Sequence, residues 1–441
     1  MKAQTNSFSL NVLIAPDKFK GTLTARQAAE AIAEGWKRVR PADKLTLLPI
    51  SDGGDGFGEV LSHVWDAKQK SVRTIDAAHR PLRARWWWEP KRKAAIIESA
   101  AVIGLAQLPP KRFHPFHLDT YGLGAVIRAA SRQGARRCII GIGGSATNDG
   151  GFGLAVALGW QFLDAAGRKI ETWPHLNKLE HIVPPKRLAK AGARARTAES
   201  FPLDRAPLPN RESKRALPKG SPSPGAAGEA SVKNRSNPGR GEGEPVKLFD
   251  EITVAVDVQN PLLGKNGATR IYGPQKGLRT RDFIKAEDSL RRLAHIAKRD
   301  LGLDLKDEPG TGAAGGLGFG LAAFLAARLE PGFHLFAREA RLATKLRHTD
   351  LVITGEGRLD ASTAMGKGVG ELARLCRKLG IPCIGLAGEV VPTQKLKNFS
   401  QTAGITDLTD DRLAKKRPAF WLARLADAVA RKDELRESHL L

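Results

Sequence analysis

The 441-residue sequence contains only three cysteines, Cys138, Cys376 and Cys383, and no CxxC pair. It therefore offers neither a disulfide framework nor a zinc site of paired thiolates, and we expect the cysteines to be small buried residues. No apolar run approaches the roughly 18 residues that a membrane span needs, and the apolar run near residue 11 is too short for a secretory signal. We therefore expect no membrane contact and a location in the cytoplasm.

Acidic residues are scarce, because 46 Asp and Glu stand against 71 Lys and Arg, a formal net charge of +25 at pH 7. Such a charge is compatible with nucleic-acid binding, since basic side chains neutralise phosphates. However, residues 186–247 alone hold 14 Lys or Arg against 6 Asp or Glu. No aromatic residues alternate with the basic ones as a single-strand binding surface requires. We favour solvated basic faces, and nucleic-acid binding is the less favoured alternative.

Residues 186–247 are rich in Pro, Gly, Ser and Arg and contain only seven large apolar side chains. Burying so few apolar groups does not offset the conformational entropy lost when about 60 residues become ordered. We predict that this segment is a disordered basic insert in a folded protein.

Short apolar runs alternate with helical patterns in the rest of the chain, which is typical of a largely parallel sheet covered by helices. Thr24 and Gln27 have the spacing of a capping box at a helix start. The runs at 72–77, 84–90 and 94–100 predict strands that pair antiparallel. Further strands are expected at 11–16, 45–50, 138–143, 252–258, 350–357 and 382–388, with helices at 24–36, 55–65, 124–134, 286–302 and 368–380, a helix after the glycine-rich stretch from 309, and a final amphipathic helix.

Polar and glycine residues follow five of these strands. Ligands of open parallel sheets bind beyond the carboxyl ends of the strands. Main-chain N–H groups and cations suit phosphate oxygens, and carboxylates suit Mg²⁺, so the pattern predicts a site for a polyphosphate and a divalent metal. The candidate residues are Asp17, Lys18 and Lys20; Asp52 and Asp55; Ser145, Thr147, Asn148 and Asp149 in GIGGSATNDGG (141–151); Asp257, Asn260, Lys265, Arg270 and Lys276; and Glu356, Arg358 and Asp360.

Two more specific nucleotide-binding motifs are alternatives to this hypothesis. The sequence has no GxxxxGK[ST], which excludes a P-loop. Gly141, Gly143 and Ala146 do satisfy the spacing of a dinucleotide fingerprint, with Asp164 about 20 residues later. That pattern would indicate an NAD-dependent dehydrogenase. We favour a phosphate-binding turn, because polar residues occupy the expected helix start and Asp164 lies in LDAAG, which predicts a hairpin turn.

Six motifs, in this order, resemble the bacterial glycerate kinase family, the type that includes the glycerate 2-kinases. They are IAPDKFKGTLTA, SDGGDG, GIGGSATNDGG, VAVDVQNPLLGKNGATRIYGPQKG, PGTGAAGGLGFG and LVITGEGRLD. The resemblance implies ATP-dependent phosphorylation of D-glycerate to 2-phosphoglycerate. Transfer to the 3-hydroxyl, or to another small hydroxy acid, stays open, as does the oligomeric state, for which a homodimer is one possibility.

The resemblance also implies an α/β fold of two domains. A flavodoxin-like domain with a parallel sheet is expected from both chain ends, residues 9–73 and 310–441. A second α/β domain with a mixed sheet, residues 74–309, is inserted into it and carries the insert 186–247.

Phosphoryl transfer depends mainly on positioning and charge neutralisation, which suggests a role for each candidate. The predicted nucleotide-binding residues are Gly143, Gly144, Ser145, Asn148, Asp149, Glu356 and Lys276, with Lys276 or Lys18 countering the phosphate charge. Asp52 or Asp257 is expected to hold Mg²⁺, directly or through water. Arg358 is predicted to bind the carboxylate of glycerate, and Asp360 or Asp17 to accept the proton of the attacking hydroxyl.

Structural alternatives stay open for several of these residues. Asp17 and Asp52 are also suited to capping helices, and Asn148 and Asp149 to capping a helix that starts near Gly150. Lys276 also suits a solvated turn. The Trp residues at 86–88 are expected to form a sheet face and not a stacking platform.

Overall fold

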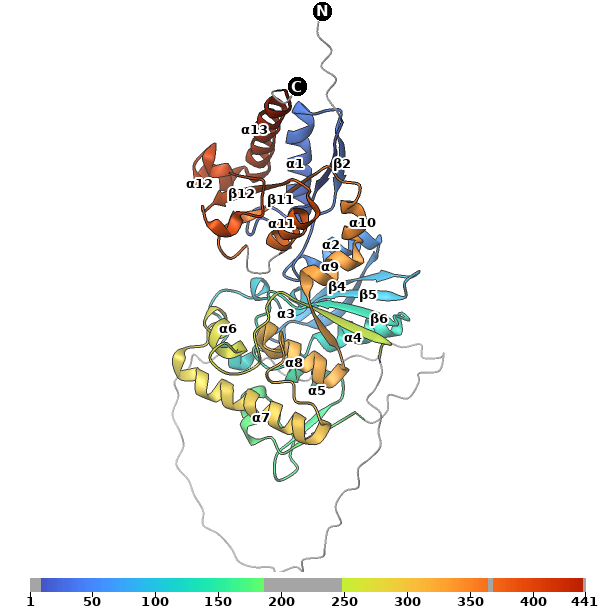
Figure 1. Ribbon diagram of the computed structural model, residues 1–441. Helices are drawn as coiled ribbons and strands as arrows, with labels where there is room; N and C mark the ends of the chain where they lie inside the picture. The colour runs from blue at the N-terminus through green and yellow to red at the C-terminus, as the bar shows by residue number, and fades with distance from the viewer. Residues whose placement is uncertain (1–8, 186–247, 364–367, 439–441) are drawn as a thin grey trace, which may run out of the picture.

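The computed structural model describes residues 9–185, 248–363 and 368–438. The predicted insert at 186–247 lies outside the described residues. The described chain forms two lobes, each built on one main sheet (Figure 1). One lobe contains α1 (Ala25–Val39) and α13 (Pro418–Ser438), and the other contains α5 (Phe152–Ala157), α6 (Ala268–Lys276), α7 (Phe283–Leu301) and α8 (Ala313–Leu325).

The first sheet has five strands, all parallel, in the order β13-β12-β11-β1-β2. Counted along the chain this is the order 2-1-3-4-5, which flavodoxin-like folds share. Both ends of the chain contribute to it, as predicted. Its strands are β1 (Asn11–Ile14), β2 (Lys44–Leu47), β11 (Leu351–Leu359), β12 (Cys383–Val390) and β13 (Gln401–Gly404).

Helices cover both faces of this sheet because successive residues of a strand point to opposite sides. Val12 and Ile14 of β1 pack with α1 (Ala25–Val39) and α13 (Pro418–Ser438). Leu13 points the other way, into a cluster that includes α11 (Gly368–Leu379). The sheet is therefore buried on both sides, and its strands read as continuous apolar runs.

Helix α1 begins at the predicted position. The Thr24 hydroxyl accepts the N–H of Gln27 at 3.2 Å, and the Gln27 side chain accepts the N–H of Thr24 at 3.0 Å. This reciprocal capping box satisfies two N–H groups that the first helical turn leaves unpaired. The predicted capping box is confirmed.

The second sheet has six strands in the order β10-β9-β6-β5-β4-β3. Strand β4 runs antiparallel to both β3 and β5, as predicted, and the other neighbours are parallel. The Trp residues at 86–88 on β4 are buried in it. Its strands are β3 (Lys68–Ile75), β4 (Pro81–Glu89), β5 (Ala94–Glu98), β6 (Arg137–Gly141), β9 (Glu251–Val256) and β10 (Arg328–Pro331).

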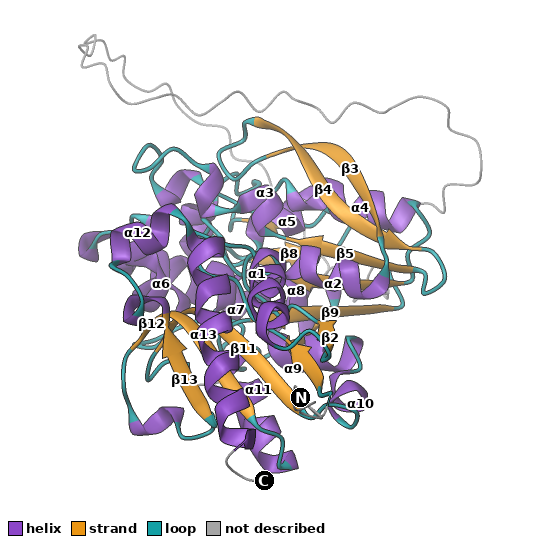
Figure 2. Ribbon diagram, turned by 90° about the horizontal axis from the view of Figure 1, so that it is seen from above, coloured by secondary structure: helices purple, strands orange, loops and turns teal. Residues whose placement is uncertain are grey.

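Figure 2 shows the remaining helices and strands around the two sheets, and α12 (Asp411–Lys416) packs against α13 in the first lobe. The helices are α2 (Phe57–Trp65), α3 (Ala100–Ile103), α4 (Leu123–Arg132), α5 (Phe152–Ala157), α6 (Ala268–Lys276), α7 (Phe283–Leu301), α8 (Ala313–Leu325), α9 (Gly332–Glu339), α10 (Leu342–Leu346) and α12 (Asp411–Lys416). A separate hairpin pairs β7 (Gln161–Leu163) with β8 (His181–Val183). Short 3-10 helices lie at 105–107, 115–117, 173–178, 280–282, 394–396 and 405–407.

The α/β class with one parallel and one mixed sheet is confirmed. Along the chain, the change from strands of one sheet to strands of the other does not occur at the predicted domain boundaries. Most of β3 lies before residue 74 and β10 lies after residue 309, yet both belong to the six-stranded sheet. The apolar pattern predicted a strand at β3 but none at β10, and it carries no information on which sheet an edge strand joins. The division into two domains itself stays a prediction.

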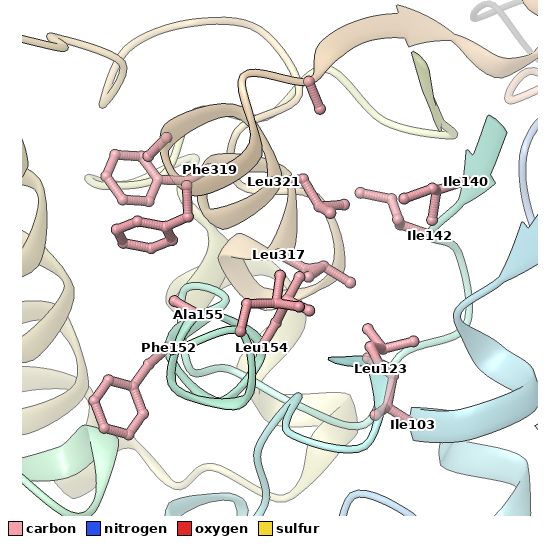
Figure 3. Packing of buried hydrophobic residues seen from close by; sticks show 14 of the residues in the cluster. Ile103, Leu123, Ile140, Ile142, Phe152, Leu154, Ala155, Leu317, Phe319 and Leu321 are labelled. Carbon is pink, nitrogen blue, oxygen red and sulfur yellow. The ribbon is translucent and has the colours of Figure 1, made fainter. Parts of the chain in front are cut away.

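Buried side chains hold each lobe together and also join the two. In the second lobe, Phe152 and Leu154 of α5 and Leu317 of α8 belong to one cluster with Ile140 of β6 (Figure 3). A different cluster contains Leu13 of the first sheet together with residues of the second, including Ile96 and Ala255, linked through α2 and α9. The carboxyl ends of strands from the two sheets are thus held in a fixed relation.

A search of the described residues for a helix long and apolar enough to cross a membrane finds none.

Candidate active site

The first strand ends at the position where the strand order of its sheet reverses. Beyond β1, the Asp17 N–H donates to the Gly355 carbonyl of β11 at 2.8 Å. Burial, reinforced by the negative charge of Asp52, raises the pKa of the Asp17 carboxyl to about 8. Glu356, which follows Gly355, adds to this repulsion. The structure thus brings Asp17, Asp52 and Glu356 together at a point where α/β sheets commonly bind ligands.

The turns after β2 and β6 touch through their glycines. The Gly143 N–H donates to the Gly53 carbonyl at 3.4 Å. A Cβ atom at Gly143 would lie only 2.5 Å from the Gly54 Cα atom, and one at Gly144 would lie 1.7 Å from the Asp55 carboxylate. Glycine is therefore required at both positions, and the two predicted motifs meet across the lobes.

Asp257, which follows β9, joins the same cluster. A Cβ atom at Gly143 would lie 3.1 Å from its Oδ2 atom. Removal from bulk water, with further repulsion from Asp52, raises the pKa of the Asp257 carboxyl to about 6, and Lys18 opposes the shift. Asp17, Asp52 and Asp257, called here the acidic cluster, therefore concentrate negative charge that a cation would neutralise.

The acidic cluster suits a metal that needs few protein ligands. Within the described ranges, no group of three or more His, Cys, Asp or Glu side chains is arranged to hold a metal ion. Mg²⁺ is commonly held by one or two carboxylates, with waters and phosphate oxygens completing its six ligands. The donor set of Asp52 and Asp257 is therefore compatible with Mg²⁺ bound together with a phosphate.

The turn after β6 presents main-chain donors. Gly144 is exposed, and its carbonyl accepts the Leu105 N–H at 2.9 Å. The Ala146 N–H donates to Ile103 at 2.8 Å. Among the described residues, the N–H groups of Gly144 and Ser145 have no hydrogen-bond acceptor. Two adjacent unpaired amides can bind an anion such as a phosphate oxygen.

Asn148 and Asp149 lie behind this turn, fully buried. Asp149 accepts the Thr120 N–H and hydroxyl at 2.9 and 2.7 Å and the Gly153 N–H, in the first turn of α5, at 2.9 Å. Burial raises the pKa of the Asp149 carboxyl to about 6. The Asn148 amide donates to the Thr269 hydroxyl at 3.2 Å. Both side chains therefore shape the turn through protein contacts.

Lys276 is buried and does not lie in a solvated turn. Its Nζ atom donates to the Thr147 carbonyl at 2.6 Å. Burial lowers the pKa of its ammonium to about 8, while Asp149 and Asp257 favour the charged form. The structure thus places a cation at the turn after β6, close enough to Asp149 and Asp257 to interact with their charges.

Arg358 lies near the end of β11, and Asp360 is the first residue after that strand. Arg358 is exposed and forms ion pairs with Asp360 at 3.5 Å and with Glu389 of β12 at 3.6 Å. Glu356 accepts the Thr363 hydroxyl at 2.8 Å. Both ion-pair partners of Arg358 therefore lie at the ends of β11 and β12, and neither belongs to the acidic cluster.

A groove leads from solvent to the acidic cluster. It has a volume of about 1100 Å³ and runs between α1, α2 and α9. Asp17, Lys18, Lys20 and Asp55 line it, whereas Gly144 and Asp257 do not. The groove therefore reaches one side of the cluster and is large enough for a small organic acid.

Sequence reasoning missed Glu98, the last residue of β5. Its side chain is buried, lines the groove and accepts the Gly56 N–H at 2.7 Å. Burial raises the pKa of its carboxyl, which the Gly56 bond and Arg85 oppose. The signal was available, because the rule that located the other residues at strand ends also applies to the strand predicted at 94–100.

The structure removes the basis of the dinucleotide fingerprint. Asp164 closes a hairpin turn, with its carbonyl accepting the Gly167 N–H at 2.9 Å and its N–H donating to Arg168 at 2.9 Å. Its carboxylate accepts the Arg168 guanidinium at 2.9 Å. The predicted turn is confirmed.

Comparison with known proteins gives consistent matches over most of the chain. Residues 12–197 and 245–432 match the sequence model of the Glycerate kinase family. The glycerate kinase of Bacillus subtilis is 35% identical over 382 residues, covering 86% of this chain and 85% of the relative. The glycerate 2-kinase of Escherichia coli is 32% identical over 382 residues, 86% of each chain.

A solved structure also matches. A crystal structure from Salmonella typhimurium LT2, of a protein assigned as glycerate kinase 2, aligns with a TM-score of 0.73 at 30% identity. The alignment covers 98% of this chain and 100% of that one.

Proposed function

Since the chain belongs to the glycerate kinase family, as its six motifs indicated, we propose that it transfers the γ-phosphoryl group of ATP to D-glycerate with the help of Mg²⁺. The proposed product is 2-phosphoglycerate, and the similarity to a relative named glycerate 2-kinase supports this choice of hydroxyl.

The observation that carries the proposal is the meeting of strand ends from both sheets. Asp17 and Asp52 follow strands of the first sheet, and Gly144 and Asp257 follow strands of the second. The electrostatic coupling of Asp52 with both Asp17 and Asp257 supports their convergence. A phosphoryl transfer site requires this combination of anion donors, cation ligands and a proton acceptor.

The unpaired amides of Gly144 and Ser145 would bind phosphate oxygens. Lys276, whose ammonium donates to the Thr147 carbonyl of the same turn, would offset the negative charge that the transferring group carries. Asp52 and Asp257 would hold Mg²⁺, which when bound would neutralise negative charge on the phosphates. These groups stand at fixed positions before the substrate arrives, so little reorganisation is needed.

Asp17 would accept the proton of the attacking hydroxyl. Asp17 lines the groove that would admit a hydroxy acid, and a pKa of about 8 suits a general base near neutral pH. Arg358 would bind the acceptor carboxylate, because a Cβ atom at the preceding Gly357 would lie 3.4 Å from the main-chain nitrogen of Lys20, a residue that lines the groove. Asp360 would then orient Arg358.

A direct test is ADP release by the purified protein with ATP, Mg²⁺ and D-glycerate. We expect release to require all three, and phosphorus NMR of the product to show 2-phosphoglycerate. Product phosphorylated at the 3-hydroxyl would contradict the proposed regiochemistry. Nicotinamide-dependent absorbance changes without ATP would contradict the proposal as a whole.

The substitution Asp52→Asn tests the acidic cluster. It keeps an oxygen that can accept the Gly54 N–H, now held at 3.0 Å by Oδ1, so the turn should persist. Loss of one cation ligand should lower kcat by about 100-fold or more. Circular dichroism would verify the fold. Near-normal turnover would remove Asp52 from the site.

A further inference from the structure

Glu98 occupies an unusual position at the end of β5. Its side chain is only 6% exposed, and Oε1 accepts the Gly56 N–H at 2.7 Å. Its other oxygen, Oε2, has no hydrogen-bond partner among the described residues. A Cβ atom at Gly58 would lie 3.1 Å from Oε2, so the absence of a side chain there leaves room for the carboxyl group.

The peptide unit that Glu98 contacts also contacts Lys18. This peptide joins Asp55 to Gly56, and its carbonyl accepts the Lys18 ammonium at 2.7 Å. In a trans peptide the N–H and C=O groups point in opposite directions within one plane. One rigid unit therefore connects Glu98, in the six-stranded sheet, with Lys18, in the loop after β1 of the other sheet.

This peptide unit depends on Glu98 for its orientation. Gly56 has a left-handed backbone conformation, with φ of 88°. Because glycine has no side chain, its backbone can change readily from this conformation to others. Without an acceptor for the Gly56 N–H, the peptide can turn, and its carbonyl then no longer faces Lys18.

We propose that Glu98 is a positioning residue, which orients the Asp55–Gly56 peptide and thereby holds the Lys18 ammonium beside Asp17 at the acidic cluster. This inference rests on the proposed function, because it concerns how that site is assembled. It assigns the task to a residue that binds neither phosphate nor metal in the proposed mechanism.

Glu89 provides a matched control in the same sheet. It is 7% exposed and also accepts main-chain N–H groups, those of Lys91 and Arg92 at 3.2 and 2.6 Å. It does not line the groove. If Glu98 had only the structural role of a buried glutamate, Glu89→Ala and Glu98→Ala would therefore have equal effects on kcat.

The first experiment compares kcat for three substitutions of Glu98. Glu98→Gln keeps an oxygen for the Gly56 N–H and should stay within about threefold of the wild type. Glu98→Ala and the shorter Glu98→Asp should each lose about 100-fold in kcat, because small misplacements of catalytic groups are costly. Glu89→Ala should lower the melting temperature but not kcat. Equal kcat losses in Glu89→Ala and Glu98→Ala, or an active Glu98→Asp with an inactive Glu98→Gln, would overturn the inference.

The second experiment is a double-mutant cycle with Lys18→Met. If Glu98 acts through Lys18, the Glu98→Asp loss should largely disappear in the Lys18→Met background. Additive losses would overturn the inference. Failure of the proposed function is a separate outcome: wild-type protein without glycerate-dependent ADP release contradicts the function, whereas an active wild type with a fully active Glu98→Asp variant contradicts only this inference.

Discussion

At the residue scale, the site depends on ionisable groups whose protonation the fold has altered. Burial and the charge of Asp52 raise the pKa of Asp17 to about 8, and burial lowers that of Lys276 to about 8. Asp17 must lose a proton to act as a base, whereas Lys276 must keep its proton to act as a cation. The proposed mechanism therefore has opposing requirements on pH.

We predict a bell-shaped dependence of kcat/KM on pH, centred near pH 8. The acid limb reports protonation of Asp17 in the free enzyme, and the alkaline limb reports the loss of charge on Lys276. Asp17→Asn should remove the acid limb and Lys276→Met the alkaline limb, each at a reduced rate. Steady-state ADP release from pH 6 to 10 measures both. An unchanged acid limb in Asp17→Asn would contradict the role of Asp17.

The same residue links stability to pH, without any need for turnover. The folded protein retains a proton on Asp17 between about pH 4 and 8 that the unfolded chain has lost, so this contribution to the unfolding free energy falls as pH rises through that window. Asp17→Asn should flatten that part of the curve of stability against pH, measured by urea unfolding. The same slope in both proteins would mean that Asp17 has an ordinary pKa when folded.

The identities of these residues were predictable from sequence, but their states were not. Asp17, Asp52 and Asp257 each follow an apolar run, which is enough to place them at strand ends. Burial is the main cause of the raised pKa values of Asp17 and Asp257, and the charge of Asp52 adds to both, although about 200 residues of chain separate Asp52 from Asp257. Lys276 lies in GPQKG, a pattern equally compatible with a solvated turn, and only the packing shows that it is buried.

At the element scale, the site depends on how closely main chains approach. The start of α8 has left-handed backbone at Ala314, Gly315 and Gly316, which brings it against the turn at Thr147 and Asn148. The sequence predicted a glycine-rich start to this helix. It did not indicate that the glycines support the phosphate-binding turn, because that contact joins segments about 170 residues apart.

The substitution Gly315→Ala tests this support. Its Cβ atom would lie 2.0 Å from the Thr147 carbonyl oxygen, where φ is already +72°. We expect a loss of about 3 kcal/mol or more in unfolding free energy and a reduced kcat, since the turn must move. Gly302→Ala is the control, because Gly302 has a similar φ of +73° but no atoms within 4 Å of the added carbon. It should cost about 1 kcal/mol and leave kcat unchanged.

Two outcomes would contradict this account of α8. Equal destabilisation by the two alanine variants would show that backbone conformation, and not contact with the turn, explains the glycine. A fully active Gly315→Ala variant would show that the phosphate-binding turn tolerates displacement.

At the scale of the whole molecule, two sheets joined by a common core hold strand ends from both lobes in one place. The flavodoxin-like parallel sheet was implied by family resemblance, and the antiparallel strands were predicted from the apolar runs. Which sheet β10 joins was not predictable from the sequence. Its partner is β9, and α6, α7 and α8 lie between the two strands in the chain. The match to the family omits residues 198–244, which are most of the basic insert, and the predicted site residues all lie outside the insert.

We therefore predict that replacing residues 186–247 with a short Gly/Ser linker leaves kcat and KM for D-glycerate within about twofold of the full chain. ADP release and thermal unfolding of the two proteins measure this. A protein whose activity resides in nucleic-acid binding by the insert would lose its activity. Loss of turnover in a variant that still unfolds cooperatively would contradict the separation of insert and site.

The most direct test of the account is a crystal structure of the protein with Mg²⁺ and a non-hydrolysable ATP analogue. We predict phosphate oxygens within hydrogen-bonding distance of the Gly144 and Ser145 N–H groups, with Mg²⁺ between a phosphate and Asp52 or Asp257. A nucleotide whose phosphates lie away from these strand ends would contradict it.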